Sequence, residues 1–239
     1  GDPDPAEHRV RTASPADPSG ASPAAAAPFD WTAFDAFTWT HLVVVVVAAV
    51  LAAALLRAGR RLRRENPVGE RRLRIALAVS IVVAQVAAGI HWLRPSRFDP
   101  TVSLPLHVCD LAPWIAVVAL GSRFGRGEAL RALTYFLGLG LSSWGFAWPV
   151  LTQGPATFVF WLFWIVHWQI VAVALYLPVV GDWRPGWRDV RTAAIAVIAY
   201  AVLVTPVNLA LDANYGYVGA VSGPADLLGP WPWRVPVLV

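Results

Sequence analysis

The sequence contains no lysine, a single cysteine and few charged residues of either sign. Charged residues make up 14% of its 239 residues, whereas a soluble domain usually carries about 25%. Hydrophobic residues make up 57% and recur in long runs, which excludes one water-soluble core and indicates a bilayer as the solvent. The single cysteine, Cys109, excludes an intrachain disulfide, so cysteine usage carries no information about the redox compartment.

Six apolar runs reach the roughly 20 residues that are needed to cross about 30 Å of hydrocarbon. The fold class that we predict is therefore an all-α integral membrane protein, a bundle of six antiparallel transmembrane helices. The predicted spans cover residues 38–56, 73–93, 103–121, 129–150, 155–180 and 190–211.

The 19 basic residues, all of them arginine, indicate the orientation of these spans. Eight lie in residues 57–74 and three in each of the loops 122–131 and 181–191, which share one side of the membrane; the other side carries four. The positive-inside rule places the arginine-rich side in the cytoplasm and the N-terminus outside. This clustering accounts for the net charge of +4 without a nucleic-acid partner, and the partners that we predict are membrane lipids.

Three regions follow from this organisation. Residues 1–37 are predicted to be a disordered extracytoplasmic tail that ends in an interfacial aromatic segment, because Pro, Ala, Ser and Asp dominate and apolar residues are few. Residues 38–211 form the transmembrane domain. Residues 212–239 are an extracytoplasmic loop and a Pro/Trp-rich C-terminal segment, in which LGPWPWRVPVLV at 228–239 reads as a partial seventh span, either truncated or re-entrant.

The third predicted span carries His107, Cys109 and Asp110 in its outer third. An Asp at the centre of a span costs roughly 2.5–3.5 kcal/mol on insertion scales, so such residues favour a functional site lined by other helices. On the predicted topology, polar residues of the other spans fall in the same outer layer or near mid-depth. These are His41, Gln85, His91, Ser142, Ser143, His167, Gln169 and Asn208. The pattern predicts one cavity that opens to the outer leaflet or the outer water.

Each of these residues also has a structural interpretation. Cys109 is either a reactive thiol or an inert small hydrophobe, and His167 either acts in the cavity or only bonds a neighbouring helix. His41 and His91 lie near interfaces and are read as solvated, and the remaining polar residues of the layer fit packing and interhelical bonds. No metal or cofactor motif is convincing, because His107, Cys109 and Asp110 lack a second ligand pair at helical spacing.

The motifs LPLHVCDL at 104–111, FWIVHWQIVAVALYL at 163–177, NLALDANYGYV at 208–218 and DLLGPWPW at 226–233 resemble the YwaF-like integral membrane proteins of bacteria. The resemblance implies a location in the bacterial cell membrane. Vertebrate relatives of that family, known as transmembrane protein 164, are implicated in phospholipid acyl transfer with a membrane-embedded Cys nucleophile and a His partner. By motif match these residues are Cys109 and His167.

The resemblance thus implies a lipid acyltransferase in which His167 activates Cys109. His107 and Asp110 would orient the pair or hold the lipid head, and Gln169 or Asn208 would donate to the oxyanion. A lipid-binding or small-molecule transport protein without a covalent step would use the same polar layer. Transporters often show repeated halves or interrupted helices. The sequence has no repeat, although Pro105, Pro113, Pro149 and Pro206 could break helices. A purely structural membrane subunit is the third interpretation.

Overall fold

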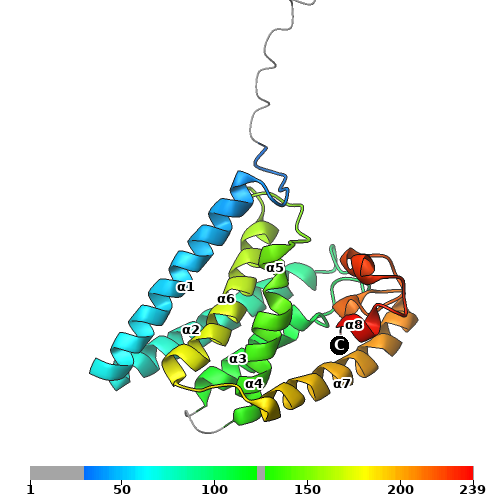
Figure 1. Ribbon diagram of the computed structural model, residues 1–239. Coiled ribbons are helices and arrows are strands. Elements are labelled where there is room, and N and C mark those ends of the chain that lie inside the picture. Colours follow the sequence, from blue (N-terminus) through cyan, green and yellow to red (C-terminus); the bar gives the residue numbers. More distant parts are fainter. Residues whose placement is uncertain (1–29, 123–126, 239) are drawn as a thin grey trace, which may run out of the picture. The chain divides into compact units, whose positions relative to one another are not determined.

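The computed structural model describes residues 30–122 and 127–238 of the chain. Helices form nearly all of its regular structure, and the β-structure within these residues is one isolated bridge between Ala33 and Gln153. The prediction of an all-α protein is confirmed, whereas the predicted disorder of the N-terminal tail concerns mainly residues outside the described part. In chain order the helices are α1 (Trp39–Glu65), α2 (Pro67–Trp92), α3 (Val108–Gly121), α4 (Glu128–Phe136), the π-helical η2 (Leu137–Ser142), α5 (Trp144–Ala147), α6 (Phe158–Gly181), α7 (Trp187–Leu211), the short 3₁₀ turns η3 (Tyr215–Tyr217) and η4 (Pro224–Leu228), and α8 (Val235–Leu238) (Figure 1).

Four of the described helices, α1, α2, α6 and α7, are long and apolar enough to cross a membrane. The fourth predicted span is continuous but not uniform, because α4, η2 and α5 follow one another with only Ser143 between the last two. Helices α1 and α2 extend beyond their apolar runs and meet at Asn66, whose side chain accepts a hydrogen bond from the Gly69 N–H and so caps α2. The arginines at 57–64 therefore belong to the last turns of α1 rather than to a loop.

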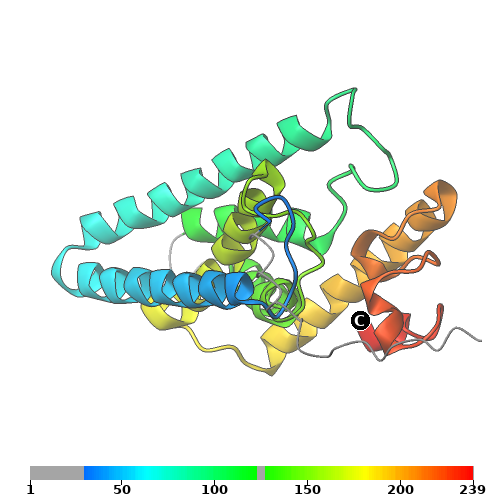
Figure 2. The ribbon, with the colours of Figure 1, turned by 90° about the horizontal axis from the view of Figure 1, so that it is seen from above.

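Helix α6 lies at the centre of the bundle and contacts α1, α2, α3, α4 and η2 (Figures 1 and 2). Half of the residues in the most apolar stretch of α6 are buried inside the protein, compared with 6% for the corresponding stretch of α1. Its packing against α1 depends on Gly59, where an added Cβ would lie 2.6 Å from the Tyr176 ring. The largest core cluster joins α2, α3 and α6 and consists of Leu77, Ile81, Ala116, Ala119, Leu120, Val173, Tyr176, Leu177 and Val180.

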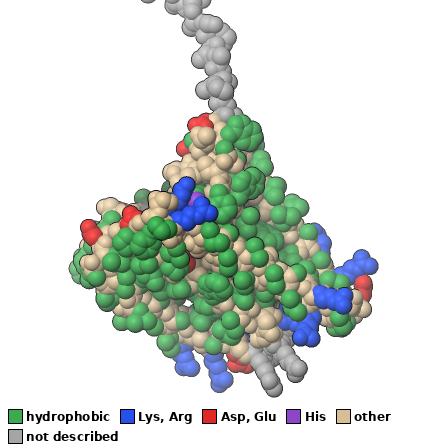
Figure 3. Space-filling model, turned by 180° about the vertical axis from the view of Figure 1, so that it is seen from behind, with side chains coloured by type: hydrophobic (Ala, Val, Ile, Leu, Met, Phe, Trp, Pro, Cys, Tyr) green, Lys and Arg blue, Asp and Glu red, His purple; other side chains and the backbone are tan. Residues whose placement is uncertain are grey.

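The outer surface of the bundle is largely apolar. On α1, Val43, Val46, Val47 and Val50 are all at least half exposed. Figure 3 shows hydrophobic side chains over most of one face, with most of the visible Arg side chains at its lower and right-hand edges. Such a surface would be unfavourable in water and is the surface expected of helices that face lipid.

Helix α3 is shorter than its predicted span. It begins at Val108 instead of residue 103 and has 14 residues, which gives a length of about 21 Å, less than the hydrocarbon thickness. Residues 103–107, which the prediction included in the helix, form bends instead, with His107 in an extended conformation. Pro113 and Pro206 do not interrupt α3 and α7, because both helices continue through them.

His41, which the sequence suggested was solvated, is buried at the start of α1. Its Nδ1 accepts from the Phe37 N–H (3.0 Å), so its Nε2 carries the proton and donates to the Phe146 carbonyl (2.8 Å). The ring also packs edge-on against Phe34 and tilted against Trp164. His41 thus ties α1 to α5 and α6, a structural role.

Candidate functional site

The non-helical segment before α3 is held in place by two tyrosines from distant parts of the chain. Tyr215 accepts a hydrogen bond from the Leu104 N–H (3.0 Å) and donates to the Pro100 carbonyl (2.8 Å). Tyr200 of α7 donates to the Leu106 carbonyl (2.7 Å). Irregular backbone at membrane depth is stable only where protein satisfies its polar groups. These two hydroxyls therefore allow α3, and with it Cys109, to start inside the bundle.

Residues 213–219 of the tail pack over the start of α3. Asn208, at the end of α7, accepts from the Tyr215 N–H (2.7 Å) and donates to the Tyr215 carbonyl (2.9 Å). Both atoms of its amide are thus used, and the side chain is almost fully buried. Asn208 therefore supports the site by holding Tyr215 through one N–H and the oxygen of its amide.

His107 and Asp110 occupy the first turn of α3 and its N-cap. The Asp110 carboxylate accepts from the His107 backbone N–H (3.0 Å), so it caps the helix and does not bond the imidazole. The imidazole accepts at Nδ1 from the Gly216 N–H (3.3 Å) and packs against the rings of Tyr215 and Tyr217. The pair therefore joins α3 to the tail.

Cys109 lies one residue into α3 and packs against a buried cluster from α2, α3, η2 and α6. That cluster consists of Ala84, Ala112, Leu137, Val166 and Ile170. Val166, a member of this cluster, directly precedes His167 in α6. The cysteine is partly buried and packs against the bundle interior.

His167 is oriented by its own helix. Its Nδ1 lies 2.8 Å from the Phe163 carbonyl, and its ring lies 4.2 Å from the Phe163 ring. The other nitrogen, Nε2, lies beside Gly145 of α5, where an added Cβ would be 2.7 Å away. Within residues 30–122 and 127–238, no hydrogen bond joins Cys109 to His167.

Gln169, two residues further, faces α2 and is buried. Its Nε2 donates to the Ser80 hydroxyl (3.2 Å), while its Oε1 is buried without a hydrogen-bond partner among the described residues. In the same part of the chain, no group of three or more His, Cys, Asp or Glu side chains could hold a metal ion.

Tyr200, Tyr215 and Tyr217 were missed by the sequence reasoning. Tyrosine is usual at membrane interfaces, so hydropathy gives it no special weight. The sequence does contain one signal for them, the Tyr-Gly-Tyr pattern at 215–217, because a glycine between two tyrosines indicates a turn. Gly216 and Tyr217 both have positive φ (65° and 62°), a conformation that is uncommon for tyrosine.

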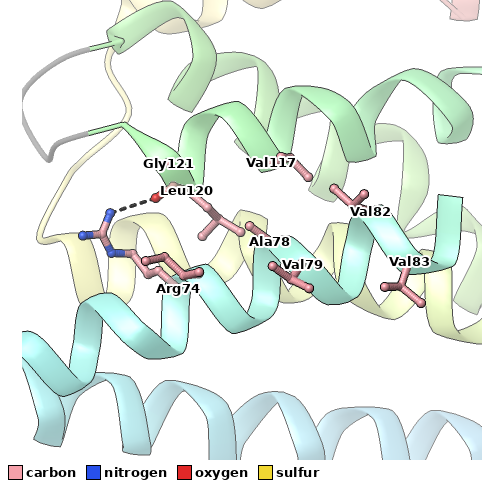
Figure 4. A pocket seen from close by; sticks show the side chains of 9 residues that line it. Arg74, Ala78, Val79, Val82, Val83, Val117, Leu120 and Gly121 are labelled. Carbon is pink, nitrogen blue, oxygen red and sulfur yellow. Dashed lines mark hydrogen bonds between the residues drawn. The ribbon is translucent and has the colours of Figure 1, made fainter. Parts of the chain in front are cut away.

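An apolar groove of about 240 Å³ lies between α2 and α3. Figure 4 shows Arg74 at one end of this groove, with its guanidinium turned toward the Leu120 carbonyl (2.9 Å) and valines along the rest. Gly121 also lines the groove, at the opposite end of α3 from Cys109. The groove is therefore separate from the cluster around the cysteine.

The apolar helices, the lipid-facing surface and the polar cluster at the start of α3 define a multi-pass α-helical membrane protein, which associates with membrane lipids. The chain belongs to the TMEM164 family, whose family model matches residues 36–238. The match includes all the helices described above and the tail that packs on α3. No curated protein and no solved structure matches the chain.

Proposed function

We propose that this protein is a lipid acyltransferase of the bacterial cell membrane, in which Cys109 is the nucleophile and His167 is its base. The observation that carries the proposal is the contact between His167 Nδ1 and the Phe163 carbonyl. A carbonyl oxygen only accepts hydrogen bonds, so Nδ1 carries the proton and Nε2 of the neutral ring keeps its lone pair. A ring held in this tautomer is suited to take a proton from a thiol.

The reaction would run in two balanced halves. His167 Nε2 takes the thiol proton, Cys109 Sγ bonds to the carbonyl carbon of a glycerolipid ester, and an electron pair moves to the carbonyl oxygen. The ester C–O bond then breaks and His167 returns the proton to the departing oxygen, which leaves a lysolipid and an acyl thioester. A hydroxyl of a second lysolipid attacks the thioester by the reverse sequence and restores the thiol. The absence of a resting Cys109–His167 hydrogen bond is compatible with this scheme, since catalytic pairs often close only with substrate bound.

Backbone groups of α3 are the best-placed donors for the oxyanion. The N–H groups of Val108 and Cys109 are at the first two positions of the helix, where no intrahelical carbonyl can accept from them. Such N–H groups can stabilise an oxyanion next to the nucleophile. Gln169 and Asn208 already bond Ser80 and Tyr215, so they support the site through packing and positioning.

The test is acyl transfer by the purified protein in vesicles, from a labelled phospholipid to a lysophospholipid. We expect Cys109→Ala to remove transfer and the acyl adduct on the protein, and His167→Gln to lower the rate by roughly 10²–10⁴-fold. Ser143→Ala is the control, because the Ser143 hydroxyl donates only to the Leu139 carbonyl within η2. Full activity in a Cys109→Ser variant would exclude the thioester route.

The non-enzymatic alternative, lipid or small-molecule binding and transport, predicts a different result in the same experiment. Lysolipid would bind the wild type and the Cys109→Ala variant equally, and no acyl adduct would form on either. A helix α3 that starts inside the bundle is compatible with both catalysis and binding. Only catalysis requires the His167 tautomer that the Phe163 carbonyl imposes.

The orientation is part of the proposal. The excess of arginine in the last turns of α1, at the start of α2 and around the start of α7 supports a cytoplasmic location for that side, and the start of α3 would then lie outside. Single cysteines introduced into a Cys109→Ala background, at exposed Arg72 or exposed Arg97, would report their side through a membrane-impermeant thiol reagent in intact cells. Labelling at position 97 and not at position 72 is the expected result.

A further inference from the structure

A cavity of about 820 Å³ lies at the end of the bundle opposite to Cys109. Five arginines of α1 line it, and Val179, Val180 and Asp182 contribute from α6. The arginines are Arg57, Arg60, Arg61, Arg63 and Arg64.

The sequence places four of these arginines on one side of α1. Arg57, Arg60, Arg61 and Arg64 follow a spacing of three, four and seven residues, which puts them on one helix face. The close packing of Gly59 against Tyr176 and Val180 brings this part of α1 to the end of α6. The arginine face and the end of α6 therefore form one cavity.

Part of this charge is already used within the protein. Arg61 pairs with Glu65 (2.8 Å), an exposed i,i+4 pair, and Arg60 donates through Nε to the Val179 carbonyl (3.2 Å) at the end of α6. Arg57 and Arg64 have no ion-pair partner among the described residues, and both are exposed. Counting Glu65 and Asp182 as the acidic groups, the lining keeps an excess of positive charge.

We infer that this cavity binds the phosphate group of an acidic phospholipid, at a site separate from the proposed acyl-transfer centre. The guanidinium fork matches phosphate oxygens in a bidentate manner, and several arginines converge here. A lipid source is favoured over a soluble phosphate by the position of Arg57, the first charged residue after the apolar run of α1. A lipid beside α1 would lay its acyl chains on the exposed valines of that helix and its headgroup at Arg57.

The test compares two double variants of the full-length protein that lose the same charge. Arg57→Gln/Arg64→Gln replaces the two lining arginines that have no ion-pair partner among the described residues. Arg71→Gln/Arg72→Gln replaces two exposed arginines of α2 that do not line the cavity. Native mass spectrometry would count phosphatidylglycerol and phosphatidylcholine of matched acyl chains retained by each protein. We expect the cavity variant to lose about tenfold in its preference for phosphatidylglycerol, and the α2 variant to keep that preference within about twofold.

Two outcomes would overturn the inference. An equal loss in both variants would mean that phosphatidylglycerol responds only to the overall charge of this side of the protein. Displacement of phosphatidylglycerol by inorganic phosphate at equal concentration would show that the site takes a soluble anion. Unfolding temperatures of both variants, which we expect to match the wild type because the four side chains are exposed, distinguish lost binding from lost folding.

Discussion

The two ends of the helix bundle hold their polar groups in different ways. At the arginine end, which comprises the last turns of α1 and α6 and the first turns of α2, charged side chains pair with one another and with helix carbonyls. At the tyrosine end, which comprises residues 100–110, the end of α7 and residues 213–219, most side chains that bond backbone groups are neutral, and the Asp110 carboxylate at the start of α3 is the exception. The comparison indicates that irregular backbone inside the bundle is stabilised by hydroxyls and amides, while charge is kept where the helices end.

The buried ion pair of the arginine end gives the largest expected effect. Glu70 and Arg74 are nearly buried, with Arg74 Nε 2.9 Å from Glu70 Oε1, and Tyr176 donates to the same carboxylate oxygen (3.0 Å). Glu70→Ala takes the carboxylate away from a buried guanidinium and a buried hydroxyl. We expect it to lower the free energy of unfolding by about 3–5 kcal/mol, measured by denaturant titration in detergent.

Glu65→Ala is the matched control for that prediction. Glu65 pairs with Arg61 at the same i,i+4 spacing, but both side chains are more than half exposed. An exposed pair contributes roughly 0.2–1 kcal/mol, so this variant should stay close to the wild type. Equal losses for the two glutamates would contradict the distinction between a buried and an exposed pair.

At the tyrosine end, Asn208→Ala is expected to have the next largest effect. The variant leaves the N–H and the carbonyl of Tyr215 without their partners in a buried place. We expect a loss of about 2–3 kcal/mol and faster cleavage of the tail by added protease. Asn214→Ala is a suitable comparison, because Asn214 also makes two hydrogen bonds to backbone groups of the tail but is less buried. The prediction fails if the two variants unfold alike.

Sequence reasoning predicted the all-helical fold, but it did not predict the hydrogen bonds that hold the start of α3 in place. The lengths of apolar runs indicate the fold because hydrocarbon thickness sets the length of a span. The cost of polar groups directs attention to the start of the third span, whereas the choice of Cys109 and His167 depends on the family resemblance. The start of α3 was missed because LPL at 104–106 is apolar, and hydropathy does not distinguish a bend from helical backbone. Glu65 and Glu70 each have an arginine four positions away in the sequence, and only tertiary packing buries one of the two pairs. The hydrogen bonds of Tyr200 and Tyr215 join residues about a hundred positions apart, which a single sequence does not specify.

A smaller effect on stability, but a specific one on function, is expected at Gly145. An added Cβ there would lie 2.3 Å from Cδ2 and 2.7 Å from Nε2 of His167, so Gly145→Ala must move the imidazole or α5. We expect a cost of about 1–2 kcal/mol from overpacking and a larger loss of acyl transfer than of stability. Gly140→Ala in η2 is the control, because nothing lies within 4 Å of its added Cβ. Retained transfer in the Gly145 variant would argue against Nε2 as the proton acceptor.

The smallest expected effect concerns Asp99, in the exposed loop that leads toward the tyrosine end. The Thr101 N–H and then the Thr101 hydroxyl, both 2.8 Å from Asp99 Oδ1, lower the pKa of this carboxyl below its ordinary value. A lowered pKa in the folded protein stabilises it above the ordinary Asp pKa of about 3.9, and this contribution disappears as the pH falls through the lowered value. The unfolding temperatures of the wild type and Asp99→Asn should therefore differ at neutral pH and converge in acid. Thr101→Val removes one of the two donors and should shift the convergence to higher pH; a difference that is independent of pH would mean that the carboxylate charge does not hold the loop.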